Sequence, residues 1–412
     1  MKKTTLTLWL AAVALMLCGT WGCSCGGKMQ KKENNTVRKQ NIPIDDSLRT
    51  ALGEFVKKPR MKGNFALYVY DLTADKPVYG FNENMSIPSA SCMKLLSGVA
   101  GLRLLGTNYH YPTYLFMRGK TVNGVLKGDL TLAAGLDPQF NETDMQHFAR
   151  TAKNMGINKI EGKLVANLVL TAPVKSEVHW YPWDLSFSKY GLFYKGADRV
   201  ERTMKAAFRA QGISVADSNV IVGRMPRGSR CVYRYYRPVT LVTERMFQNS
   251  SNTQATSLLY TIGRRVSPRG NYTQAGVAYL RSFLRDTLNM KDTALVVHDG
   301  CGLCTYNHLS PKALVAILHY AYQHPDIYKV LMEQLSVSGV NGTLRRELNS
   351  EKLRGKIHAK TGTLSHPYGI SSLAGYCTGR NGHQLAFSIM DSDMSVLDAR
   401  VLQKKLCEIL IK

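Results

Sequence analysis

The stretch Pro88-Ser89-Ala90-Ser91-Cys92-Met93-Lys94-Leu95-Leu96 carries the strongest structural signal in this sequence. Apolar residues continue from it at helical spacing as far as Gly106, which predicts a buried helix that ends at this glycine. Because Ser91 and Lys94 are three residues apart, one helical turn brings a hydroxyl and an amine onto the same face. The pattern therefore predicts a serine nucleophile beside a lysine that can act as its base.

A second match to the same spacing occurs at Ser186-Phe187-Ser188-Lys189. Ser-x-x-Lys is a short motif, and neither match is decisive by itself. The choice between Ser91 and Ser186 therefore depends on the rest of the chain.

The amino terminus indicates export. Lys2 and Lys3 precede an apolar run at residues 6–17 and then small residues, which is typical of a secretory signal peptide over residues 1–22. Thr20-Trp21-Gly22-Cys23 resembles a loose bacterial lipobox, so Cys23 is a candidate lipidation site, and ordinary cleavage near residues 24–26 is the alternative. The polar residues 23–44 then predict a tether between the lipid anchor and the folded domain. The protein is therefore expected to be a periplasmic, membrane-anchored lipoprotein.

With 412 residues, 44% apolar and 20% charged, the chain is expected to be globular, and its formal net charge of +25 predicts anionic partners. For an exported protein these are acidic cell-wall peptides, lipopolysaccharide or anionic lipid rather than nucleic acid. Basic clusters occur at residues 57–62, 224–237 and 345–356, and a solvated surface is the alternative interpretation of each.

The two ends of the chain predict one antiparallel sheet. A helix at residues 45–56 and a hairpin at residues 65–81 begin the chain, and strands at residues 356–364, 370–377 and 384–391 precede a closing helix. Helical patterns at residues 238–284 and 311–335 lie between them. The fold class is therefore α+β, with a sheet from both chain ends, flanking helices and a helical subdomain.

Residues 107–237 have a different texture, with short strands, a hairpin across Val122-Asn123-Gly124 and an aromatic-rich segment at residues 178–194. They are predicted to form an inserted, mostly-β second domain. The main domain then consists of residues 45–106 and 238–412.

Two later motifs follow Ser91 in order: Ser250-Ser251-Asn252 in a helical stretch and Lys360-Thr361-Gly362-Thr363 on a predicted strand. Ser-x-x-Lys, Ser-x-Asn and Lys-Thr-Gly in this order are the set found in penicillin-binding proteins and serine β-lactamases. The sequence resembles the class C penicillin-binding proteins, D-alanyl-D-alanine carboxypeptidase/endopeptidases of the penicillin-binding protein 4 type. Residues 299–311 and 339–344 resemble further family segments, and this order selects Ser91 over Ser186.

The resemblance implies a β-lactamase/transpeptidase-like fold and an oxyanion hole made by the backbone N–H groups of Ser91 and Thr363. The chain departs from the family at Ser251, where an aspartate is usual, and at Cys301 and Cys304, which replace serines. These cysteines either form a small disulfide or pack as serine-like replacements. The interval from Ser91 to Ser250 is also shorter than in the larger members.

Each motif residue has a chemical role that follows from its side chain. Lys94 can take the serine proton if burial near a second cation such as Lys360 lowers its pKa. Ser250 can relay a proton to the leaving amine, and the Asn252 amide can hold a substrate peptide group. The hydroxyls of residues 361 and 363 can bind a terminal carboxylate, and Gly362 leaves room along the strand edge.

We therefore expect a serine-type D-alanyl-D-alanine carboxypeptidase/DD-endopeptidase that acts on peptidoglycan stem peptides through an acyl-enzyme on Ser91. Penicillin and other β-lactam antibiotics would be covalent inhibitors, and no metal or cofactor is needed. A serine β-lactamase or esterase on the same scaffold is one alternative. A non-catalytic, basic lipoprotein that binds the cell wall is another.

Overall fold

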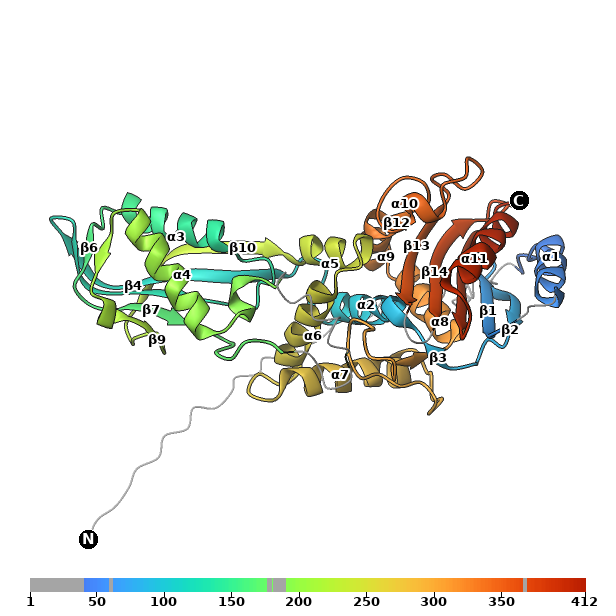
Figure 1. The fold of residues 1–412 in the computed structure, drawn as a ribbon, viewed down its shortest axis with the longest axis horizontal. Helices are drawn as coiled ribbons and strands as arrows, with labels where there is room; N and C mark the ends of the chain where they lie inside the picture. The colour runs from blue at the N-terminus through green and yellow to red at the C-terminus, as the bar shows by residue number, and fades with distance from the viewer. Residues whose placement is uncertain (1–40, 59–61, 176–179, 181–189, 366–368) are drawn as a thin grey trace, which may run out of the picture. The chain divides into compact units, whose positions relative to one another are not determined.

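A six-stranded antiparallel sheet joins the two ends of the described chain (Figure 1). The computed structural model describes residues 41–58, 62–175, 180, 190–365 and 369–412, of which those from 42 onward form one compact unit. The strand order is β12 (Ser336–Val337), β13 (Ile357–Leu364), β14 (Ile370–Thr378), β15 (Gln384–Ser392), β1 (Asn64–Asp71) and β2 (Lys76–Phe81). Since β1 pairs with β15 along its whole length, the predicted sheet from both chain ends is confirmed.

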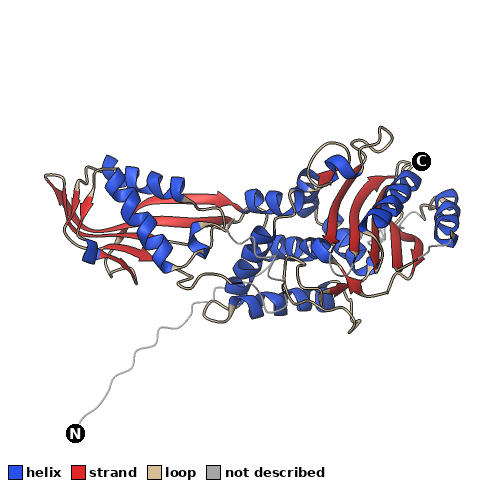
Figure 2. Ribbon diagram, in the orientation of Figure 1, coloured by secondary structure: helices blue, strands red, loops and turns tan. Residues whose placement is uncertain are grey.

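Helices cover both faces of this sheet, as Figure 2 shows. On one face lie α1 (Asp46–Lys57) and α11 (Val396–Leu410), and on the other lie α2 (Met93–Leu105) and α8 (Pro311–Tyr322). The strands alternate accordingly: Leu373 belongs to the core under α11, whereas Ala374 belongs to the core under α8. The sheet therefore separates two hydrophobic cores.

The helical region packs around α2. It contains α5 (Val239–Gln248), α6 (Asn252–Val266), α7 (Tyr272–Ser282) followed by a π-helical turn (Phe283–Thr287), α9 (Pro325–Gln334) and α10 (Leu344–Glu347). A Cβ atom on Gly98 of α2 would overlap the ring of Phe247, so this glycine permits the close packing of α2 against α5. The expected buried helix is present and ends at Gly106.

A second sheet lies within residues 110–238. Its strands are β4 (His110–Val122), β5 (Val125–Ala133), β6 (Lys159–Ile160), β7 (Leu164–Asn167), β8 (Ser214–Val215), β9 (Val220–Val222) and β10 (Arg230–Pro238). The predicted hairpin turns at Asn123 and Gly124, which both have positive φ. Strands β10, β4 and β5 are antiparallel, whereas β6 to β9 pair in parallel.

Two helices of this region, α3 (Glu142–Asn154) and α4 (Ala197–Ala210), were not predicted. Asn141 and Asp144 form a capping box at the start of α3, so the signal for this helix was present in the sequence. The division into domains at residues 107 and 237 remains a prediction.

Three sequence-based assignments lie outside the described residues. They are the signal peptide and tether as far as residue 40, the lipidation site Cys23, and the second Ser-x-x-Lys match at Ser186 and Lys189. None of the helices in the described ranges has both the length and the apolar character of a membrane span.

Candidate active site

Ser91 lies in a short 3₁₀ turn (Ala90–Cys92) directly before α2. Ala90 has a φ of 46°, a left-handed conformation that residues with a Cβ atom rarely adopt. The hydroxyl of Ser372 on β14 donates to the carbonyl oxygen of Ser89 at 2.7 Å, and the Gly302 backbone packs closely against Ala90. The turn that presents Ser91 is therefore held by both the sheet and the loop at residues 299–304.

The amine of Lys94 is fully buried and lies 2.8 Å from the Ser91 hydroxyl oxygen. It also donates to Asn252 Oδ1 at 2.7 Å and to the Cys301 carbonyl oxygen at 2.6 Å. Burial lowers the pKa of Lys94, although the nearby Cys301 and Asp299 oppose this shift. A neutral amine has two N–H bonds, which it can donate to Asn252 Oδ1 and the Cys301 carbonyl oxygen. Its lone pair is then available to accept the proton of the Ser91 hydroxyl.

Lys360 on β13 provides a second buried amine. Its Nζ donates to Ser250 Oγ at 2.8 Å and to the Thr361 carbonyl oxygen at 2.7 Å. Burial and then repulsion from Lys94 lower the pKa of Lys360 to about 7. Burial is the main cause of the lowered pKa of both amines, and their mutual repulsion further disfavours a state in which both are charged.

The Ser250-Ser251-Asn252 motif forms the turn between α5 and α6. Ser250 has a φ of 55°, and its hydroxyl accepts the hydrogen bond from Lys360. Ser251, which stands where the family usually has an aspartate, caps α6 by accepting from the backbone N–H of Gln254. Since Asn252 Oδ1 binds Lys94, its amide nitrogen is the group that can bind a substrate carbonyl.

A buried carboxylate, Asp299, organises the loop behind Lys94, and it was not among the predicted site residues. Asp299 accepts hydrogen bonds from three backbone N–H groups in its own loop and from the Asn307 amide and the Trp180 indole, at 2.6 to 3.0 Å. These bonds fix the loop so that its Cys301 carbonyl points at Lys94. Asp-Gly-x-Gly is the sequence signal that could have indicated this tight, carboxylate-stabilised turn.

The Lys-Thr-Gly motif lies at an open edge of the main sheet. Strand β12 pairs only with His358 and Ala359, so among the described strands none pairs with the same side of β13 from Lys360 onward. Thr361 is buried and donates to Thr343 Oγ1 at 2.8 Å, whereas Thr363 is partly exposed. An extended peptide can therefore add to this edge beside Thr363.

Gly362 packs tightly against the turn that carries Ser91. A Cβ atom at this position would overlap Ser372 Oγ and would lie 2.6 Å from the Ser89 carbonyl oxygen. The missing side chain thus makes room for the Ser91 turn.

Gly362→Ala is expected to displace the Ser91 turn, because the Ser89 carbonyl oxygen that the new methyl group would overlap belongs to this turn. Overpacking of this kind costs roughly 1–3 kcal/mol of unfolding free energy. We expect a lower denaturation midpoint and slower acylation by a fluorescent penicillin. Gly223→Ala controls for general glycine replacement, because Gly223 has no positive φ and a Cβ atom there would make only an ordinary contact of 3.7 Å with Ile221. Unchanged acylation in Gly362→Ala would contradict this packing role.

The cysteines near the site are thiols. Cys301 and Cys304 are buried and are not joined by a disulfide, which agrees with their interpretation as packed, serine-like replacements. Cys92 Sγ lies 3.2 Å from the Lys360 carbonyl oxygen. Among the described residues no cluster of three or more His, Cys, Asp or Glu side chains is suited to a metal.

This geometry defines a class of protein: a serine hydrolase in which a buried lysine, rather than a histidine, contacts the nucleophile. The structure brings together Ser91, Lys94, Ser250, Asn252 and Lys360 from the 3₁₀ turn, α2, the α5–α6 segment and β13. Such an arrangement suits acyl transfer.

Comparison with known proteins agrees with this class. The family model for the D-Ala-D-Ala carboxypeptidase 3 (S13) family matches residues 48–190 and 193–412, so the chain belongs to this family. The predicted family and fold class are therefore confirmed, and so is the predicted enzyme class, a serine-type D-Ala-D-Ala carboxypeptidase.

The individual relatives share less than a quarter of their residues with this chain. The D-alanyl-D-alanine carboxypeptidase DacB of Haemophilus influenzae is 24% identical over 79% of this chain and 84% of its own length. The crystal structure of penicillin binding protein 4 from the same species has a TM-score of 0.74 at 19% identity, covering 90% of this chain and 100% of that one. A penicillin G-acylated predatory endopeptidase from Bdellovibrio bacteriovorus has a TM-score of 0.54 at 18% identity, covering 83% and 90%.

Proposed function

We propose that this chain cleaves D-alanyl-D-alanine stem peptides of peptidoglycan, and D-centred cross-links, through an acyl-enzyme on Ser91. The observation that carries the proposal is the contact of 2.8 Å between the Ser91 hydroxyl and the buried, pKa-lowered amine of Lys94. Family membership supports the reaction, and the open edge of β13 supports an extended peptide substrate.

In the proposed acylation, neutral Lys94 takes the Ser91 proton while Oγ attacks the carbonyl carbon of the penultimate D-alanine. The backbone N–H groups of Ser91 and Thr363 stabilise the oxyanion. The C–N bond then breaks, and the leaving amine receives a proton through Ser250, whose hydroxyl lies beside Lys360. Water next hydrolyses the ester and frees Ser91.

Carboxypeptidase and endopeptidase cleavage differ only in the leaving amine, which carries either a free carboxylate or a continuing cross-link. Lys360, Thr363 and the Asn252 amide nitrogen are the groups proposed to bind the substrate around the scissile bond. Thr361 supports them through its bond to Thr343. A β-lactam acylates the same serine, but its leaving amine stays attached to the adduct.

Fluorescent penicillin tests this proposal directly. The mature protein is expected to form a persistent adduct that mass spectrometry maps to Ser91, and to release D-alanine from a stem pentapeptide. Ser91→Ala should lose both signals, whereas Ser218→Ala, at an exposed serine between β8 and β9, should keep them. Rapid turnover of the penicillin would indicate a β-lactamase instead, and the absence of both adduct and D-alanine release would refute both enzymes.

The proposal places the protein in the periplasm, anchored through a lipid on Cys23. The charged and apolar amino terminus and the Thr20-Trp21-Gly22-Cys23 pattern support it. Labelled palmitate should be incorporated into the wild-type chain and not into Cys23→Ala. Equal incorporation in both would place the lipid elsewhere and contradict this assignment.

A further inference from the structure

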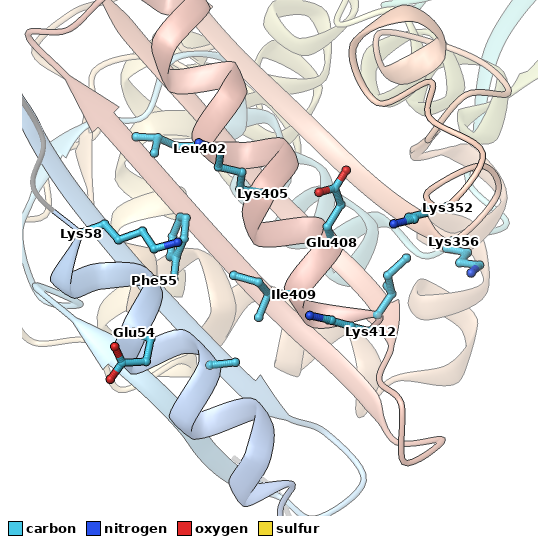
Figure 3. Close-up of a pocket in the computed structure, with 12 residues that line it drawn as sticks. Glu54, Phe55, Lys58, Lys352, Lys356, Leu402, Lys405, Glu408, Ile409 and Lys412 are labelled. Atoms are coloured by element: carbon cyan, nitrogen blue, oxygen red, sulfur yellow. The ribbon is translucent and has the colours of Figure 1, made fainter.

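A groove lies between α1 and α11, and none of the proposed catalytic residues lines it (Figure 3). Its volume is about 850 Å³. Phe55 of α1, Leu402 and Ile409 of α11, and Ile411 supply its apolar lining. The groove is therefore large and apolar enough to hold a hydrocarbon chain.

Five lysines, all labelled in Figure 3, surround this apolar lining. They are Lys58, Lys352, Lys356, Lys405 and Lys412. Two of the three basic clusters noted in the sequence thus meet at one place, although they are almost 300 residues apart. Within the described part of the chain none of the five is in an ion pair, and Glu54, one of two carboxylates at the groove, is bound by Lys57.

The surface around the groove is also amphipathic. Leu397 and Val401 of α11, which are four residues apart and so share a helix face, are 71% and 51% exposed. Exposed apolar side chains among lysines are typical of protein surfaces that contact anionic membranes.

The sheet places the groove opposite to the catalytic centre. Ile357 and Ala359 of β13 face the core under α1 and α11, whereas Lys360, by strand alternation, faces α2 and Ser250. A surface bound through the groove would therefore leave the Ser91 side accessible to the cell wall. Helix α1 begins at Asp46, directly after the proposed tether, so this face also adjoins the segment that would lead to a lipid anchor.

We infer that this groove binds an anionic membrane phospholipid and so docks the enzyme on the membrane through α1 and α11. One acyl chain lies against Phe55, Leu402 and Ile409, and the lysines bind the phosphate head group. Charge and apolarity together select this occupant. A symmetric second copy would set five lysines against five, and an acidic peptide would leave the apolar lining unused. The inference goes beyond the proposed function and does not require lipidation of Cys23.

Vesicle binding tests this site. The mature chain with Cys23→Ala, which lacks both the predicted signal peptide and the proposed lipid, is titrated with vesicles of phosphatidylcholine with and without phosphatidylglycerol. We expect binding only to the anionic vesicles. The triple variant Lys58→Gln/Lys356→Gln/Lys405→Gln should bind them on the order of a hundredfold more weakly, from about fivefold per lysine.

A matched control removes the same charge elsewhere. Lys120, Lys127 and Lys159 are exposed on the second sheet, and their triple glutamine variant should bind the vesicles nearly as the parent does. Leu402→Ser should weaken the binding that persists at high salt, because the acyl contact is not screened. If a triple variant unfolds, the exposed single change Lys405→Gln should still give about a fivefold loss.

Three outcomes would overturn the inference. Equal losses in the two triple variants would show that net charge alone drives binding. Competition by polyglutamate as strong as that by phosphatidylglycerol vesicles would identify an acidic peptide site. A concentration-dependent dimer that is lost in the groove variant would identify a second copy. Penicillin labelling of Ser91 should be unchanged in the groove variant, so failure of this inference stays separate from failure of the proposed function.

Discussion

Lys94→Met is expected to slow acylation of Ser91 by a fluorescent penicillin by a factor of about 10² to 10⁴, the usual contribution of a general base. Methionine fills the buried space but has no lone pair of sufficient basicity to take the serine proton. The expected change is in the acylation rate at saturating penicillin. The unfolding midpoint should change little, because the variant also removes the cost of burying an amine.

Lys94→Arg separates basicity from charge. A guanidinium retains the positive charge but stays protonated, so this variant should be as slow as Lys94→Met. A near-normal rate in Lys94→Arg would show that Lys94 acts only through its charge.

The pH dependence gives a second readout of the same residue. Because burial lowers the pKa of Lys94, the wild-type acylation rate should rise about tenfold per pH unit below that pKa and then level off. The apparent pKa belongs to the pair, since Lys360, with a pKa of about 7, titrates nearby. The rising limb should vanish in Lys94→Met; a profile that keeps it would assign the base elsewhere.

Asp299→Ala is expected to reduce the unfolding free energy by roughly 3–5 kcal/mol. Five buried donors would lose their acceptor, among them the backbone N–H groups of Cys301, Gly302 and Cys304. The Cys301 carbonyl would then no longer be held against Lys94, so acylation should fall together with stability. Denaturant unfolding and penicillin labelling measure the two effects.

Asp299→Asn and Asp292→Ala are the matched controls. In Asp299→Asn the amide oxygen can still accept the hydrogen bonds now made to Oδ1. The amide nitrogen that replaces Oδ2 cannot accept from the Cys304 N–H, so we expect an intermediate loss of stability and of acylation rate. Asp292 is exposed and accepts one backbone bond, and its replacement should have little effect. A stable, fully active Asp299→Ala variant would show that Asp299 is not needed to hold the Cys301 carbonyl against Lys94.

Local patterns were sufficient for much of the fold. The strand-like runs at residues 370–377 and 384–391, the apolar period after Ser91 and the Asn123-Gly124 turn each specify an element through neighbouring residues alone. The second sheet was less accessible. Strands β6 to β9 have only two to four residues and pair in parallel, so their partners are far along the chain and leave little periodicity to detect.

The chemical identity of the site is a property of the sequence, because the order of Ser91, Lys94, Ser250, Asn252 and Lys360 already names the residue types that acyl transfer requires. What the sequence could not supply is their electrostatic state. Only the fold buries both amines, places Ser250 against Lys360 and aims the Cys301 carbonyl at Lys94 through Asp299. Burial and hydrogen-bond direction depend on segments more than 100 residues apart, whereas the motifs are local, and this is why tertiary structure alone decided them.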